Sequence, residues 1–216
     1  MTNLSPERRP IASRDSGWAK RTASFLAHHN VSPNSISVLS IFFAALSLLA
    51  FYLDSMTDNV VSHALMLILA ITGIQGRLIM NLLDGMVAVE HDRKSPVGGL
   101  YNEVPDRVSD SLILFGLIFT VKSYPYGIDL VYLAIALSIA TAYIRALGAS
   151  LGCGHHFLGP MAKQHRMALV TVSCVVAIWY EPVFYWALMI MNAGLVITCY
   201  RRLARVYQLL NSQAKH

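Results

Sequence analysis

The chain has 216 residues, of which 55% are apolar and only 13% are charged. Soluble domains average about 45–50% apolar and about 25% charged residues, so this composition excludes an ordinary water-soluble globule as well as a disordered chain. The net charge is +5, and the basic residues gather in the first 21 positions and in the C-terminal tail. This placement suits anionic lipid head groups and not nucleic acid. One membrane span needs about 20 apolar residues, so about 119 apolar side chains can supply about six spans.

The first predicted element is an amphipathic helix over residues 16–28. One of its faces carries Trp18, Thr22, Phe25 and Leu26, which is typical of a helix that lies in the membrane interface. Ser32 and Pro33 then predict the N-cap and first turn of the first membrane span.

The apolar runs that follow predict six transmembrane helices. We expect them at about 35–53, 60–89, 98–121, 128–150, 165–180 and 183–203. The second run would form a helix of about 45 Å, longer than the hydrocarbon core of about 30 Å, so it should project on one side. The predicted fold class is therefore all-α: a polytopic membrane protein with six transmembrane helices after an N-terminal interfacial helix. The predicted organisation is a cytoplasmic segment 1–31, a membrane domain 32–207 and a cytoplasmic tail 208–216.

Basic residues predict the orientation of this bundle. With six spans, one side of the membrane carries the connections at 54–59, 122–128 and 180–182. Of the 17 basic residues in the chain, this side holds one, Lys122. By the positive-inside rule the opposite side is cytoplasmic, so both termini should face the cytoplasm.

Polar side chains interrupt the apolar pattern on the second and third predicted spans. Helical spacing places Asn81, Asp84, Gly85 and Ala88 on one face, and Asn102, Asp106 and Asp110 on another. Ionisable groups in membrane helices are costly and mark functional sites. A short connection makes the two helices antiparallel neighbours, so the two faces can meet near the cytoplasmic surface. Oxygen donors of this kind suit Mg²⁺ or Mn²⁺. The alternative is that the acids are simply paired with Arg77 and Arg107.

The stretch 81–110 resembles the signature of the CDP-alcohol phosphotransferases, D-x-x-D-G-x-x-A-R followed by G-x-x-x-D-x-x-x-D. The matching positions are Asp84, Gly85, Ala88, Gly98 and Asp106, whereas Asn81, Val89 and Asn102 depart from it. Outside the signature, the resemblance includes Pro33-Asn34 and a second basic region with Tyr143-Ile144-Arg145, Gly159, Lys163 and Arg166. It covers about residues 30–200. The two asparagines resemble a divergent bacterial branch in which both also occur.

This resemblance implies an integral membrane enzyme of phospholipid biosynthesis. In that family a divalent metal, Mg²⁺ or Mn²⁺, binds the pyrophosphate of a CDP-linked donor, usually CDP-diacylglycerol. An acceptor hydroxyl attacks the phosphorus that bears the lipid, and CMP leaves. The resemblance further implies a homodimer in the bacterial inner membrane, with the active site on the cytoplasmic side.

The resemblance also implies roles for individual residues. Asp106 would be the general base and a metal ligand. The other metal ligands would be Asn81, Asp84 and Asn102. Donor contacts would fall to Asn34, Gly85, Ala88 and Gly98. A hydroxyl acceptor, possibly phosphorylated, would be held by Arg145, Lys163 and Arg166.

The departures from the signature change the expected charge of the site. Four aspartates carry about −4 and balance two divalent ions, whereas Asp84 and Asp106 supply only about −2. The site therefore holds one metal, or two held weakly until the phosphates of the substrate arrive. Glu90 or Glu103 could restore the charge. Val89 removes an expected pyrophosphate contact, which Arg77, Arg93 or Lys94 could replace.

Two other functions remain open from the sequence. A catalytically silent relative that binds CDP-lipid or scaffolds other enzymes would explain the lost acids, although Asp84 and Asp106 are retained. A small transporter would also use intramembrane acids, but its sites usually lie near the bilayer midplane. Here the acids are expected at a helix end. Release of CMP would separate an enzyme from both alternatives.

Overall fold

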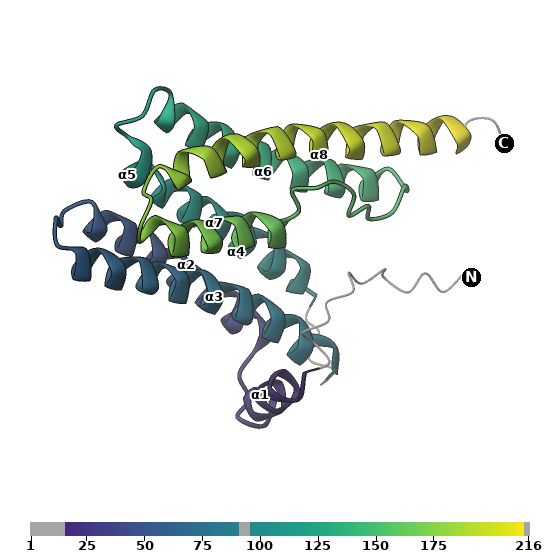
Figure 1. Cartoon of the computed structure of the whole chain (residues 1–216). Helices are drawn as coiled ribbons and strands as arrows, with labels where there is room; N and C mark the ends of the chain where they lie inside the picture. Colours follow the sequence, from purple (N-terminus) through teal and green to yellow (C-terminus); the bar gives the residue numbers. More distant parts are fainter. Residues whose placement is uncertain (1–15, 91–95, 214–216) are drawn as a thin grey trace.

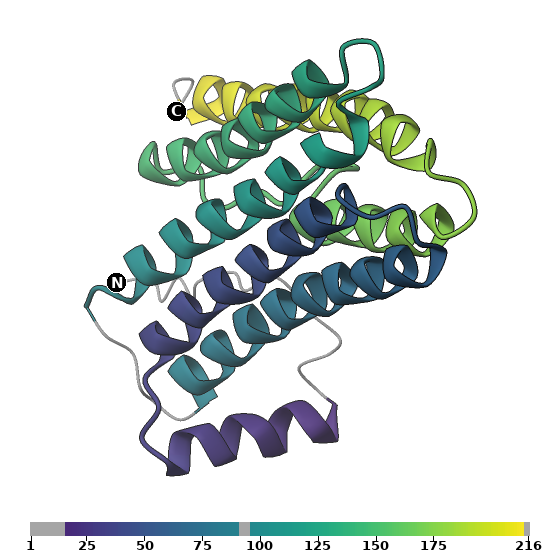
Figure 2. The ribbon, with the colours of Figure 1, turned by 90° about the vertical axis from the view of Figure 1, so that its left-hand side faces the viewer.

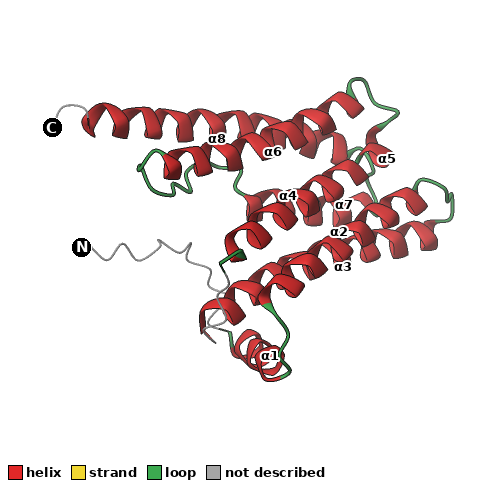
Figure 3. Cartoon of the chain, turned by 180° about the vertical axis from the view of Figure 1, so that it is seen from behind, coloured by secondary structure: helices red, strands yellow, loops and turns green. Residues whose placement is uncertain are grey.

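The computed structural model describes residues 16–90 and 96–213, and these two segments are helical throughout apart from short turns and loops. The helices are α1 (Gly17–His28), α2 (Pro33–Asp54), α3 (Val60–Glu90), α4 (Gly98–Gly116), α5 (Ile118–Val121), α6 (Gly127–Ser150), α7 (Lys163–Ala177) and α8 (Val183–Gln213). Within the described segments there is no strand, so the all-α prediction is confirmed for this part of the chain (Figure 3).

The long helices form two pairs with two shorter helices between them (Figures 1 and 2). α2 packs along α3, and α6 packs along α8. α4 contacts α2 on one side and α6 on the other, while α7 contacts α3 and α8. The central core contains fully buried side chains from these helices, among them Phe51, Leu67, Ile74, Ile113 and Leu188. The middle helices thereby connect the two pairs.

The start of α2 follows the prediction closely. Ser32 has an extended backbone and its hydroxyl accepts a hydrogen bond from the Ser35 backbone N–H at 3.0 Å, with Pro33 in the first turn. This hydroxyl satisfies one of the four N–H groups that a helix start leaves without a partner.

α1 lies across the end of the α2–α3 pair and is seen end-on in Figure 1. A stripe of small residues, Ala19, Ala23 and Ala27, is buried with Ile36 of α2 and with Leu82, Leu83, Met86 and Val87 of α3. Trp18 and Phe25 stay exposed, at 48% and 59%. The sequence analysis assigned the large apolar face and missed the alanine face, which lets α1 approach the bundle closely. Insertion of Trp18 and Phe25 in the membrane interface stays a prediction.

Four helices, α2, α3, α6 and α8, are long and apolar enough to cross a membrane. Their outward side chains are apolar and exposed, for example Phe42 at 61%, Val61 at 68% and Ile190 at 59%. In water such surfaces would be costly, whereas lipid covers them without penalty. The prediction of membrane-spanning helices is therefore confirmed for these four segments.

Two predicted spans differ from the structure in length. α7 has 15 residues, which as a helix measures about 22 Å, short of the hydrocarbon core. The third predicted span is divided at Leu117 into α4 and the four-residue α5, and α4 carries its acidic and basic residues in its first four turns. At the other extreme, α8 continues to Gln213, well past the predicted end near residue 203.

Candidate active site

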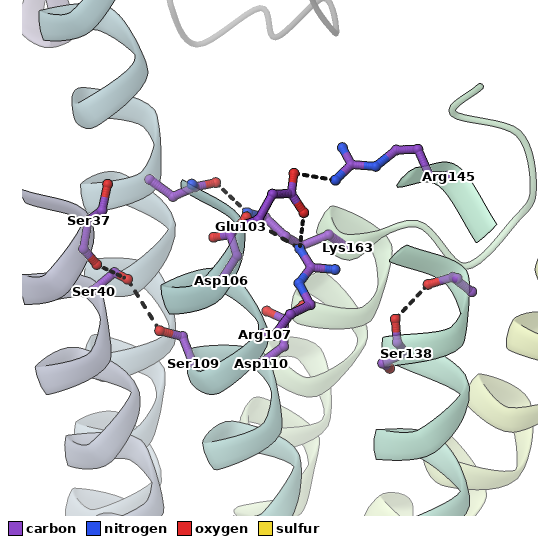
Figure 4. A network of polar contacts seen from close by, with 12 residues as sticks. Ser37, Ser40, Glu103, Asp106, Arg107, Ser109, Asp110, Ser138, Arg145 and Lys163 are labelled. Atoms are coloured by element: carbon purple, nitrogen blue, oxygen red, sulfur yellow. Dashed lines mark hydrogen bonds and ion pairs between the residues drawn. The ribbon is translucent and has the colours of Figure 1, made fainter. Parts of the chain in front are cut away.

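Polar side chains from five helices converge at one end of the bundle (Figure 4). They come from the second half of α3, the first half of α4 and the first turn of α7, with contributions from the start of α2 and the end of α6. The antiparallel arrangement of α3 and α4 that the sequence predicts is what brings their polar faces to the same end.

Asp106 lies at the centre of this cluster and is 7% exposed. Arg77 donates from Nη2 to its Oδ1 at 3.1 Å, and Lys163 donates from Nζ to its Oδ2 at 2.6 Å. Arg107 approaches the same Oδ2 at 3.5 Å. Because a carboxylate accepts about four hydrogen bonds, Oδ1 retains a lone pair for a further partner.

Asp84 is held from a different helix. The Ser37 hydroxyl on α2 donates to its Oδ2 at 2.5 Å, whereas its Oδ1 is buried without a hydrogen-bond partner. A buried carboxylate oxygen without a partner is costly and marks a place where a cation or a donor group fits. The sequence analysis missed Ser37. Its signal is a polar stripe on the otherwise apolar α2, where Ser37, Ser40 and Ser47 share one buried face.

Asp110 forms a buried ionic bridge beneath Asp106. Its two oxygens lie 2.6 Å from Arg77 Nη2 and 2.8 Å from Arg166 Nη2. Both arginines are almost fully buried, at 0% and 2% exposure, and Arg166 also donates to the Met161 carbonyl at 3.1 Å. The pairing interpretation therefore holds for Asp110, and also for Asp106, which is paired with Arg77 and Arg107. The fully buried Arg77 joins the two acids and does not face outward.

The two asparagines of the signature lie in different surroundings. The Asn81 amide oxygen accepts a hydrogen bond from Lys163 Nζ, so the structure brings Asn81, Lys163 and Asp106 into direct contact. Asn102 is exposed on α4. The described residues contain no cluster of three His, Cys, Asp or Glu side chains that could hold a metal, so amide and ligand oxygens would have to complete any metal site.

The residues expected to contact the CDP-linked donor lie at the starts and ends of the helices that form this cluster. Asn34 lies in the first turn of α2, Gly85 and Ala88 lie in the last turns of α3, and Gly98 begins α4. At Gly85 an added Cβ would meet no atom within 4 Å, so the helix has open space beside it at this position. Arg93 and Lys94, two of the proposed replacements for the arginine expected at Val89, lie outside the described residues. Arg77, the third, pairs with Asp106 and Asp110.

Arg145 and Glu103 form the outer part of the site. The Arg145 guanidinium at the end of α6 pairs with Glu103 of α4 and lies over the Phe157 ring at 5.5 Å from its centroid. Arg107 lies 3.9 Å from the same carboxylate. Glu103 remains 44% exposed, whereas the Arg145 side chain is 18% exposed.

The charges of the inner cluster balance without a metal. Asp84, Asp106 and Asp110 oppose Arg77, Lys163 and Arg166, and the outer group adds two arginines for one glutamate. The buried Asp84 Oδ1 fits one divalent ion, while the oxygens of Asn81 and Asp106 already hold an ammonium. The residues therefore fit a metal at Asp84, and the donor phosphates would supply the charge that attracts it.

Comparison with solved structures identifies the fold of the chain. The structure superposes with a TM-score of 0.73 on the phosphatidylinositol phosphate synthase of Mycobacterium tuberculosis with CDP-DAG bound, over 89% of this chain and 94% of that one, at 19% identity. The same enzyme in complex with manganese and citrate gives a TM-score of 0.72 over 88% of each chain, at 19% identity. The chain therefore has the fold of a phosphatidylinositol phosphate synthase.

Sequence relatives agree with this fold. The archaetidylinositol phosphate synthase of Aeropyrum pernix is 28% identical over 74% of this chain and 75% of its own length. The inner membrane protein YnbA of Escherichia coli is 23% identical over 90% of this chain and 92% of its own. No model of a known family matches the sequence. Together with the four apolar helices, the likeness to an inner membrane protein supports an integral membrane protein.

Proposed function

We propose that the protein is a CDP-alcohol phosphatidyltransferase that transfers a phosphatidyl group from CDP-diacylglycerol, or a similar CDP-alcohol, to a hydroxyl acceptor. The observation that carries this proposal is the convergence of Asp84 and Asp106 from two helices, with Lys163 from a third. This convergence occurs in the fold of an enzyme whose structure has been determined with CDP-DAG bound. Relatives named archaetidylinositol phosphate synthase support the same class of reaction.

In this proposal Asp106 is the general base. The remaining lone pair of its Oδ1 takes the proton of the acceptor hydroxyl as the hydroxyl oxygen bonds to the phosphorus that bears the lipid. The bond from this phosphorus to the oxygen of the CMP phosphate breaks, and CMP leaves with that electron pair. A bound Mg²⁺ or Mn²⁺ supplies positive charge that neutralises the pyrophosphate.

The remaining residues of the site hold the substrates in this proposal. Asp84, oriented by Ser37, is the carboxylate metal ligand, with Asn102 as a neutral oxygen donor, whereas the Asn81 oxygen holds the Lys163 ammonium. The cytidine and pyrophosphate occupy the open side of Gly85, between Asn34, Ala88 and Gly98. The excess positive charge of the outer group suits a phosphorylated acceptor. Arg145, paired with Glu103, is the residue of this group that we assign to the acceptor, while Arg166 acts from beneath through Asp110.

The membrane arrangement follows from the same contacts. Lys163, at the start of α7, touches Asn81 of α3 and Asp106 of α4, and Arg145 near the end of α6 touches Glu103. The end of α3, the start of α4 and the segment 151–162 therefore lie at one end of the bundle, which favours crossings by α4 and α7 together with the four longer helices. We propose six crossings over 32–207, with 1–31 and 208–216 on the cytoplasmic side of a bacterial inner membrane, and a homodimer.

The competing proposal is a catalytically silent relative that binds CDP-lipid. It is favoured by Asn81 and Asn102, which lack the charge of the acids expected there, and by the engagement of both Asp106 oxygens.

Incubation of the purified protein with CDP-diacylglycerol, Mn²⁺ and a panel of acceptors tests the proposal. The panel contains alcohols in free and phosphorylated form, including inositol phosphate. We expect CMP release and a new phospholipid, identified by mass spectrometry, with one or more phosphorylated acceptors. CDP-lipid binding without CMP release across the panel would instead support the silent relative.

A further inference from the structure

Lys163, the first residue of α7, points its ammonium into the polar cluster. Its ammonium lies between the amide oxygen of Asn81 and the Oδ2 of Asp106, and the side chain is 17% exposed. Asn81 and Asp106 stand at positions of the signature that the family resemblance assigns to metal ligands. The ammonium therefore contacts two of the four oxygen donors that a pair of metal ions would share.

The backbone that carries Lys163 is held by the neighbouring helix. The Met161 backbone N–H donates to the Thr198 hydroxyl of α8 at 3.0 Å, and Arg166 donates to the Met161 carbonyl at 3.1 Å. Arg202 of α8 donates to the Leu158 carbonyl at 3.0 Å. Because the segment before α7 is fixed at three points, the ammonium is directed at Asn81 and Asp106 by the fold.

Charge counting shows what this ammonium replaces. The inner cluster is neutral without a metal, since three carboxylates oppose three cations. One divalent ion and the two negative charges of a donor pyrophosphate keep it neutral. A second divalent ion would leave an excess of two positive charges in a buried site, which is unfavourable.

We infer that the Lys163 ammonium takes the place of one metal ion, so that this site binds a single divalent ion, held through Asp84, together with the CDP-linked donor. The inference rests on the proposed function for the identity of the donor. It also assigns Lys163 to the metal-binding side of the site, which leaves Arg145 to contact the acceptor. Asn81 is neutral because its partner is an ammonium and not a metal.

Counting bound Mn²⁺ tests this inference directly. The full-length protein in nanodiscs is titrated with Mn²⁺ at saturating CDP-diacylglycerol, and free and bound Mn²⁺ are measured by electron paramagnetic resonance. We expect one Mn²⁺ per chain with the spectrum of an isolated ion. Two Mn²⁺ per chain with a spin-coupled spectrum, or no bound Mn²⁺, would overturn the inference.

Variants show whether Lys163 is the reason for the single ion. Asn81→Asp with Asn102→Asp should still bind one Mn²⁺, because Lys163 then pairs with the new carboxylate. Adding Lys163→Met should raise the count to two and produce spin coupling. The matched control adds Arg145→Met instead, which removes a cation that contacts Glu103, and should leave the count at one. Two ions in the double variant with Lys163 retained, or one ion after Lys163→Met is added, would contradict the role of Lys163.

The single variant Lys163→Met provides a measurement that does not require a second site to form. Removal of a like charge should tighten Mn²⁺ binding in the absence of donor by about tenfold or more, and unchanged affinity would contradict the inference. The metal count is independent of catalysis. A protein that binds one Mn²⁺ but releases no CMP would refute the proposed function alone, whereas CMP release with two bound Mn²⁺ would refute only the inference.

Discussion

At the scale of single residues, Asp106 receives more ionic contacts than its carboxylate neighbour Asp84 and retains a free lone pair on Oδ1. Replacement Asp106→Asn keeps the size of the side chain but removes its ability to take a proton. We expect turnover to fall by at least about 100-fold, the usual contribution of general base catalysis, while CDP-lipid binding is largely kept. CMP release and binding of a CDP-lipid by calorimetry measure the two effects. Near-normal turnover would remove Asp106 as the base.

Arg145 and Arg166 carry the same charge but should respond differently to neutralisation. Arg145→Gln leaves the half-exposed Glu103 solvated, so stability should change by less than about 1 kcal/mol, while the KM for a phosphorylated acceptor rises and the KM for the donor does not. Arg166→Gln leaves Asp110 with one buried partner, which should cost about 3 kcal/mol. Steady-state kinetics and thermal unfolding separate these effects. Equal changes in both KM values for Arg145→Gln would indicate folding or anchoring instead.

The sequence predicted part of this site and missed the rest for a physical reason. Asp84, Asp106 and Asn81 are recognisable because helical spacing places polar groups on a shared face of an apolar helix. The contacts of Ser37 with Asp84 and of Lys163 with Asn81 join residues 47 and 82 positions apart. Such contacts depend on how α2 and α7 pack, which no local pattern reports. Likewise, the pairing of the buried Arg77 with Asp110 joins two different helices, and the sequence did not show which acid Arg77 would contact.

At the scale of elements, helix starts were predicted best where capping chemistry is present. The start of α2 matches because Ser32 and Pro33 define it. The break at Leu117 directly follows Gly116, which the sequence analysis did not read as a helix end. The end of α8 lies in a polar sequence where hydropathy no longer reports helix length. Hydropathy thus locates the membrane-embedded part of a helix and says little about a polar extension beyond it.

The packing of α2 against α3 depends on the absence of a side chain at Gly73. An added Cβ there would lie 2.6 Å from the Phe43 carbonyl oxygen of α2, so the two backbones would have to separate. We expect Gly73→Ala to destabilise the protein by about 1–3 kcal/mol and to lower its unfolding temperature in detergent. The matched control is Gly17→Ala, where an added Cβ meets nothing within 4 Å. Equal unfolding temperatures for both variants would show that α2 and α3 do not require this close approach.

At the scale of the whole molecule, the number of crossings decides on which side of the membrane the site lies. If α2, α3, α4, α6, α7 and α8 all cross, residues 122–126 lie on the side of the α2–α3 turn, and residues 151–162 lie on the opposite side. If only the four helices that meet the length and hydropathy criteria cross, these two positions exchange sides. Because Lys163 and Arg145 contact α3 and α4, we predict the first arrangement.

Cysteine labelling in intact cells distinguishes the two arrangements. In a background with Cys153, Cys174 and Cys199 replaced by serine, three single variants introduce one cysteine each: Met56→Cys, Tyr126→Cys and His155→Cys. All three positions are exposed, and Met56 in the α2–α3 turn defines the reference side. With a membrane-impermeant maleimide, we expect the Tyr126→Cys variant to react as the Met56→Cys variant does, and the His155→Cys variant to react only after permeabilisation.

Labelling of the His155→Cys variant together with the reference, while the Tyr126→Cys variant stays protected, would mean that α4 and α7 do not cross. Because Lys163 could not then reach Asn81 and Asp106 from the other side of the bilayer, that result would also dismantle the site.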